Sequence, residues 1–198
     1  MADLMVTHWM RFAKNHSNKY LLCIGLLLLA QQAAAACNKD DWQQLLRHAD
    51  TSAVAGYIKS HHCDLDQSLD DISRPALVYA IEGHNRAAVQ VLLQAGADPN
   101  IDGHDGRTPL FYAVQSKDIG IVEDLIAKGA DVNAYTRTSG ITVLMIAVLE
   151  SSPAIITALV AHGASLNETD KYDQTAMNYV DKLPVHRRAA MRAALRKR

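Results

Sequence analysis

Two short runs of the sequence carry residue types that could bind a metal ion. The first is His61-His62-Cys63-Asp64, in which imidazole, thiolate and carboxylate groups are all ligands of transition metals. Adjacent side chains on a loop rarely converge on one ion, and a tetrahedral site needs four ligands with defined spacing. The sequence therefore predicts no metal site here.

The second run, from Asp98 to Gly103 (DPNIDG), matches the opening half of an EF-hand calcium loop. The twelfth position of such a loop would be Pro109 in place of the bidentate glutamate, and a proline there suits the first position of a helix. We therefore expect a loop between two helices, without bound calcium, and we expect the chain to need no cofactor.

The sequence does not carry the short motifs that accompany common catalytic sites. It has no G-x-S-x-G elbow, no glycine-rich phosphate loop and no H-E-x-x-H pair. Serine, histidine and aspartate are frequent, but no spacing among them singles out a catalytic triad. We therefore expect that the protein is not an enzyme.

The first 36 residues have the composition of a secretory signal peptide. Basic residues (Arg11, Lys14 and Lys19) precede an apolar run at 20–30, and small residues follow at 33–36. The alternative is a membrane anchor, but the run at 21–36 is interrupted by two glutamines and is shorter than the ~20 residues that a spanning helix needs. Residues 1–36 are therefore predicted to direct export to the periplasm.

Two cysteines, Cys37 and Cys63, would remain after cleavage. In an oxidising compartment such a pair tends to form a disulfide. Cys37 directly follows small residues, which resembles the bacterial lipobox, although Ala34 stands where leucine is usual. A lipid on the sulfur of Cys37 would exclude the disulfide, so lipidation, a disulfide and a free thiol remain as alternatives.

The rest of the chain repeats a unit of about 33 residues. The sequence GADPN at 96–100 returns as GADVN at 129–133 and as GASLN at 163–167. Apolar residues at helix starts, namely Leu77, Leu110, Leu144 and Met177, follow one another at intervals of 33, 34 and 33 residues. A period of this size predicts a solenoid of stacked helix pairs.

One unit illustrates the predicted helix pair. Thr108 suits an N-cap, Asp118 and Gly120 interrupt the apolar pattern between two helices, and Gly129 suits the left-handed residue that ends the second. Helices of eight to ten residues are not stable alone in water, so such units must stack on their copies.

These features resemble the ankyrin repeat family, through the T-P-L helix start, alanines at 80, 113 and 147 and the G-A-D-x-N ending. The resemblance covers roughly residues 40–198 and implies an all-α solenoid of stacked helix pairs with β-hairpin-like loops. The expected units are an N-terminal capping repeat at 37–72, full repeats at 73–105, 106–139 and 140–172, and a C-terminal capping repeat at 173–198.

The resemblance also implies a protein partner, because ankyrin repeats usually bind proteins through hairpin tips and first helices. Two sets of residues repeat along the first helices and should form ladders. We expect contact with a partner at Tyr79, Tyr112, Ile146 and Tyr179, at Glu82, Gln115 and Leu149, and at the hairpin residues Arg74, His104, Arg107, Arg137 and Tyr172. The alternative for the tyrosines is that their rings pack between neighbouring helices.

Charge is distributed unevenly. Residues 37–183 contain 11 Lys/Arg and 20 Asp/Glu, whereas residues 184–198 add six basic residues and no acidic one. The acidic body would repel phosphate, so nucleic acid is not an expected partner. The basic end is read as a final helix whose cations suit its dipole, with a patch for an acidic partner or a lipid headgroup as the alternative.

Together these features predict an exported bacterial protein, non-catalytic and monomeric, that binds an unidentified protein in the periplasm. One version is an immunity or inhibitor protein, and another is an accessory factor of a periplasmic enzyme. The alternative is an envelope structural protein tethered by lipid on Cys37, which would be the one route to membrane association.

Overall fold

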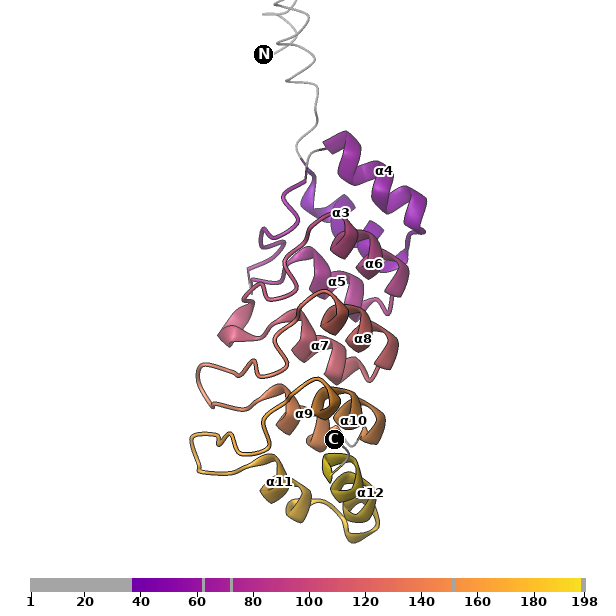
Figure 1. Cartoon of the computed structure of the whole chain (residues 1–198). Helices are drawn as coiled ribbons and strands as arrows, with labels where there is room; N and C mark the ends of the chain where they lie inside the picture. Colours follow the sequence, from indigo (N-terminus) through magenta and orange to yellow (C-terminus); the bar gives the residue numbers. More distant parts are fainter. Residues whose placement is uncertain (1–36, 62, 72, 151, 197–198) are drawn as a thin grey trace, which may run out of the picture.

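The computed structural model of the chain describes residues 37–61, 63–71, 73–150 and 152–196 (Figure 1). The predicted signal peptide, residues 1–36, lies outside the described residues. Within the described ranges the chain forms helices in consecutive pairs. These are α3 (Lys39–His48) and α4 (Thr51–His61), α5 (Ala76–Glu82) and α6 (Arg86–Gln94), α7 (Pro109–Ser116) and α8 (Ile119–Ala127), α9 (Val143–Leu149) and α10 (Pro153–Ala161), and α11 (Ala176–Lys182) and α12 (Val185–Arg196).

The pairs stack into a solenoid with two layers of helices. The first helices α3, α5, α7, α9 and α11 each contact the next, and the second helices from α4 to α12 do the same in the other layer (Figure 1). This arrangement confirms the predicted all-α solenoid. Because each pair contacts its neighbours, the first helices present their side chains in register along one face.

The core follows the sequence period. Leu77, Leu110 and Leu144 are almost completely buried at equivalent places in α5, α7 and α9. The alanines three residues further on (Ala80, Ala113 and Ala147) are also buried, and their small side chains let neighbouring first helices approach closely. Met177, at the equivalent place in α11, is half-buried and packs against this core.

Helix ends differ in part from the expectation. Thr142 caps α9 with its side chain, but Thr108, at the same place before α7, makes no side-chain capping bond. Lys117, which is left-handed, and Asp118, whose side chain caps α8, separate α7 from α8, whereas Gly120 lies inside α8. Gly129, with φ +88°, follows α8 in the left-handed conformation, as predicted.

A hairpin-like loop precedes each first helix from α5 onward. We name these loops hairpin 1 (63–75), hairpin 2 (96–108), hairpin 3 (129–142) and hairpin 4 (163–175). The backbone hydrogen bonds across them include those from Leu69 N to Arg74 O, from Gly103 N to Arg107 O, from Thr136 N to Ile141 O and from Asp170 N to Gln174 O. The hairpins project along the same edge of the solenoid (Figure 1).

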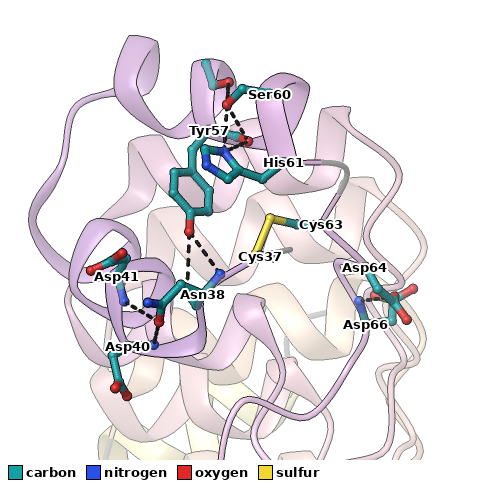
Figure 2. The surroundings of a disulfide bond; sticks show 11 residues. Cys37, Asn38, Asp40, Asp41, Tyr57, Ser60, His61, Cys63, Asp64 and Asp66 are labelled. Atoms are coloured by element: carbon teal, nitrogen blue, oxygen red, sulfur yellow. Dashed lines mark hydrogen bonds between the residues drawn. A yellow bond between two sulfur atoms is a disulfide. The ribbon is translucent and has the colours of Figure 1, made fainter. Parts of the chain in front are cut away.

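A disulfide between Cys37 and Cys63 closes the first helix pair, with 5.2 Å between the two Cα atoms (Figure 2). Beside it, the backbone N–H of Asn38 donates to the hydroxyl of Tyr57 over 3.2 Å. The ring of Tyr57 stacks on His61, with 4.0 Å between ring centroids. The bond occupies the sulfur of Cys37, so this state of the protein and a lipid thioether at Cys37 exclude one another.

Across the described ranges, every helix is too short or too polar to cross a bilayer.

Candidate functional site

The candidate site is the face formed by the first helices and the hairpins beside them. Helices α5, α7, α9 and α11 stack in order, so the predicted ladder from Tyr79 through Tyr112 and Ile146 to Tyr179 lies along one face. The four positions are not equally accessible. The two ends of the ladder are tied to their own hairpins, and the middle is not.

The prediction that Tyr79 contacts a partner needs correction, because this side chain is only 2% exposed. Its hydroxyl donates to Asp70 Oδ2 over 2.8 Å, and its ring lies between the guanidinium groups of Arg47 and Arg74, at 4.9 and 5.0 Å from its centroid. In the structure the Tyr79 side chain packs between elements, which is the arrangement of the alternative interpretation.

Arg74 and Glu82 belong to the same network. Arg74 Nε donates to Asp70 Oδ2 over 2.5 Å, and Arg74 Nη1 donates to both carboxylate oxygens of Glu82 over 2.8 and 2.9 Å. Burial raises the pKa of Asp70, but hydrogen bonds from the backbone and guanidinium of Arg74 and from Tyr79 outweigh it and lower that pKa below its ordinary value. These predicted contact residues are therefore held together by the fold itself.

The other end of the ladder repeats this arrangement with different cations. The hydroxyl of Tyr179 donates to Asp170 Oδ2 over 2.6 Å, and Lys182 Nζ lies 4.7 Å from the ring centroid. Burial and the hydrogen bond to the Asp170 carboxylate raise the pKa of Tyr179 to about 12. The Tyr179 side chain is half-buried, and its polar end is already bound.

Sequence reasoning did not assign this role to Asp70 or Asp170. The signal that could have revealed it is a spacing: each aspartate precedes its tyrosine by nine residues. The hairpin folds back over the first turns of the helix, which brings the two side chains together.

The middle of the ladder presents side chains to solvent. Gln115 is exposed, Leu149 is 41% exposed, and Tyr112 and Ile146 are half-buried. The hydroxyl of Tyr112 makes no hydrogen bond to any described residue. Burial raises the pKa of Tyr112, and the nearby positive charge of Arg107 acts in the opposite direction. We call Tyr112, Gln115, Ile146 and Leu149 the central face.

The predicted hairpin residues lie on the edge of the solenoid. His104 and Arg137 are exposed, and Arg137 forms an ion pair with Asp102 of the preceding hairpin. Tyr172 is 66% exposed, and Lys171 Nζ lies 5.2 Å from its ring centroid. The two remaining hairpin cations of the prediction, Arg74 and Arg107, lie at the base of their hairpins, next to the first helices.

The two runs examined for metal binding have other roles. Cys63 is in the disulfide, and Asn100 holds neighbouring hairpins together: its Nδ2 donates to Gly129 O over 2.9 Å, and its Oδ1 accepts from Asp131 N over 2.7 Å. Within the described ranges, no three His, Cys, Asp or Glu side chains are placed to hold a metal ion together.

A shallow cavity of about 260 Å³ lies between hairpins 2 and 3. Its lining includes Asp102, Asp131, Tyr135 and the nearly buried Thr108. The buried hydroxyl of Thr108 has no hydrogen-bond partner among the described residues, which agrees with its failure to cap α7. This cavity borders the exposed edge, whereas the central face lies on the helices.

Comparison with known proteins adds the following. Residues 32–136 match the family model for ankyrin repeats (three copies), and residues 139–171 match the model for an ankyrin repeat. A putative ankyrin repeat-containing protein of Treponema pallidum (strain Nichols) is 34% identical over 105 residues, which cover 52% of this chain and 35% of that protein. Protein PhlB of Serratia liquefaciens is 32% identical over 107 residues, which cover 54% of this chain and 47% of that protein.

A third relative is a transient receptor potential cation channel subfamily A member 1 homolog of Caenorhabditis elegans. It is 28% identical over 164 residues, which cover 82% of this chain and 13% of the channel homolog. The chain spans less than half the length of each of these relatives.

Proposed function

The chain belongs to the ankyrin repeat family, and from this premise we propose that it is an exported, non-catalytic protein that holds a protein partner on its central face. Ankyrin repeats form protein–protein interaction modules. Beyond this general role, we propose a contact surface, a compartment and a class of partner for this chain.

The observation that carries the proposal is the difference between the ends and the middle of the first-helix face. Tyr79 and Tyr179 are bound to Asp70 and Asp170, and so have limited capacity to bind anything else. In contrast, Leu149 is 41% exposed and the Tyr112 hydroxyl has no partner among the described residues. An exposed aliphatic side chain and an aromatic ring with an unused polar group, on neighbouring helices of one face, suit the centre of a protein interface.

The disulfide supports the proposed compartment. Cys37 and Cys63 are bonded, and disulfides persist in oxidising environments such as the bacterial periplasm. The composition of residues 1–36, which is that of a secretory signal, agrees with export. We therefore propose that the protein works in the periplasm, as an inhibitor, an immunity protein or an accessory factor that binds an enzyme there.

The test is capture of the partner from periplasmic extract of the source cells by the tagged full-length protein. The variant Leu149→Asp places a charge in the proposed interface and should weaken capture at least tenfold, which corresponds to about 1.4 kcal/mol. Val185→Asp is the matched control, because Val185 is an exposed aliphatic residue (77%) on α12, in the other layer of helices. It should capture the partner like the wild type.

Circular dichroism and thermal unfolding would confirm that both variants fold. Equal capture by the wild type and a folded Leu149→Asp variant would contradict the central face as the binding site. Loss of capture in both variants would point to a general effect of added negative charge, and would also count against this site.

A further inference from the structure

Hairpin 1 shows how the chain binds a carboxylate of its own. At the base of hairpin 1, the carboxylate of Asp70 accepts hydrogen bonds from the backbone N–H of Arg74 over 2.9 Å, from Arg74 Nε over 2.5 Å and from the hydroxyl of Tyr79 over 2.8 Å. An arginine and a tyrosine five residues apart thus hold one carboxylate between hairpin and helix.

The next unit repeats the arginine and the tyrosine without the carboxylate. Arg107 and Tyr112 stand 33 residues after Arg74 and Tyr79, at the same places relative to helix α7. The position of Asp70, nine residues before the tyrosine, is occupied by Gly103. Among the described residues, neither the side chain of Arg107 nor the hydroxyl of Tyr112 has a hydrogen-bond or ion-pair partner.

The backbone around Gly103 explains why the chain does not fill this position itself. A Cβ atom on Gly103 would lie 2.9 Å from Arg107 O and 3.3 Å from Ser73 O, which is too close without a shift of the backbone. The same Cβ position is 3.9 Å from the Tyr112 hydroxyl. The hydroxyl therefore lies near the region that the side chain of an aspartate at position 103 would enter.

The arrangement is specific to hairpin 2. In hairpin 3 the corresponding tyrosine and arginine positions hold Ile146 and Ile141. In hairpin 4 the carboxylate of Asp170 is present and accepts from Tyr179. Among the four hairpins, as far as the structure describes them, hairpin 2 is the one that has the arginine and the tyrosine but lacks the aspartate.

We propose that Arg107 and Tyr112 bind a carboxylate of the protein partner, so that an aspartate or glutamate side chain of the partner takes the place that Asp70 holds in hairpin 1. This inference rests on the proposed function, because Tyr112 is part of the central face. It adds the chemistry of the contact: a charge-assisted hydrogen bond from a guanidinium and a second one from a phenol.

The surrounding charges restrict which partners fit. Glu82, the acidic residue of the neighbouring ladder position, is paired with Arg74 and lies 3.5 Å from Arg47, so its charge is balanced. The body of the chain is nevertheless acidic, with 11 Lys/Arg and 20 Asp/Glu between residues 37 and 183. A suitable partner therefore presents a single carboxylate within a surface that is otherwise neutral or basic.

The test uses small probes on the full-length protein with ¹³C-labelled tyrosine rings, observed by NMR. The Tyr112 resonance is identified by its absence in Tyr112→Phe. N-acetyl-aspartate amide should shift the Tyr112 resonance in a saturable manner, while N-acetyl-asparagine amide, its neutral analogue of nearly the same shape, should not. Tyr79 and Tyr179 serve as internal controls, because their hydroxyls already donate to aspartates and should not respond.

A third probe, N-acetyl-alanine, carries a terminal carboxylate in place of a side-chain carboxylate. A stronger response to this probe than to the aspartate probe would overturn the assignment to a side chain. The variant Arg107→Gln should abolish the response to the aspartate probe. Arg137→Gln, which removes a guanidinium from the neighbouring hairpin, should leave the response unchanged.

A second variant pair tests the site from within the chain. Gly103→Asp and Gly103→Ala both require the same backbone shift to relieve the contact of the new Cβ atom with Arg107 O, but only the aspartate adds a carboxylate near Tyr112. The aspartate variant should lose the response to the probe, and the alanine variant should retain it. An unresponsive Tyr112 in the wild type, or equal shifts with the aspartate and asparagine probes, would overturn the carboxylate site.

The two proposals can fail separately. If Leu149→Asp releases the partner while Tyr112 ignores the aspartate probe, the central face stands and the carboxylate site falls. If Tyr112 responds but Leu149→Asp still captures the partner, the carboxylate site on the chain exists and its role in partner binding is overturned.

Discussion

At the scale of single residues, aspartates in the hairpins hold the hairpins against the first helices. Asp70 and Asp170 each accept a hydrogen bond from a tyrosine nine residues later and from backbone N–H groups of their own hairpin. A carboxylate bound in this way ties a loop to a helix, and its charged form is the one that binds. The stability of the face therefore depends on pH.

The sign of this dependence follows from the lowered pKa of Asp70. The ordinary pKa of an aspartate is 3.8, and the pKa of Asp70 in the folded protein is lower. The stability that such a group contributes is fully present above the ordinary pKa and is lost as the pH falls through the folded-state pKa. Asp70→Asn should lower the free energy of unfolding by about 1–3 kcal/mol near pH 6. Urea unfolding near pH 6 and near pH 3 would show whether the difference between wild type and variant shrinks in acid. A difference that is the same at both pH values would contradict the role of the charged carboxylate.

At the scale of helices and hairpins, much of the architecture was predictable from the sequence. The period places Leu110 and Leu144 at equivalent points, and both are buried in the core. The glycine signal at Gly129 also corresponds to a left-handed residue in the structure. Such features are local or periodic, so a single sequence contains them.

What the sequence did not reveal depends on contacts between elements. Tyr79 has the same spacing as Tyr112, yet it is buried, because Asp70 from the hairpin and two arginines close around its ring. Thr108 has the same place as Thr142, yet its side chain does not cap its helix. Residues at equivalent places in different repeats thus have different neighbours. As a result, the ladder of predicted contact residues is accessible mainly in its middle.

Neighbouring hairpins are joined by hydrogen bonds between a side chain of one hairpin and the backbone of the next, and we call this series of contacts the side-chain relay. Asn100 and Asn133 each accept a hydrogen bond from a backbone N–H of the next hairpin and donate one to a glycine carbonyl there. Asp66, the equivalent residue of hairpin 1, accepts from Asp98 N over 2.9 Å but, as a carboxylate, has no hydrogen to donate. The first junction therefore has one hydrogen bond of this kind where the later junctions have two.

Asp66→Asn should complete the relay by adding a donor toward Gly96, the glycine equivalent to Gly129. We expect the free energy of unfolding to rise by about 1 kcal/mol, which is typical of one intramolecular hydrogen bond. The reciprocal change Asn100→Asp should lower it by a similar amount. Chemical denaturation measures both changes. A loss of stability in Asp66→Asn would show that the missing donor does not weaken the first junction.

At the scale of the whole molecule, stability is distributed along a line, because each helix pair contacts its neighbours. The first pair lies at one end and is closed by the disulfide, across a separation of 26 residues (Figure 2). A covalent link at this place restricts the unfolded chain at the helix pair that, within the described ranges, contacts a neighbouring pair on one side only.

Replacing both cysteines by serine should lower the free energy of unfolding by about 3 kcal/mol, on the loop-entropy estimate. A reducing agent should lower the stability of the wild type in the same way and leave the double variant unchanged. The intact mass of the exported protein before and after reduction would also distinguish a disulfide from lipid on Cys37. A wild type whose stability does not respond to reduction would contradict the expected contribution of the disulfide.

The position of the disulfide also bears on the order in which the chain folds. Contacts between neighbouring pairs are local, so structure can form first in any unit and then spread along the chain. The first pair has the incomplete junction at Asp66, and the disulfide joins Cys37, just before α3, to Cys63, just after α4. The rate at which the Cys37 and Cys63 thiols of the reduced protein react with an alkylating agent would thus report how often this end of the solenoid opens, independently of the units behind it.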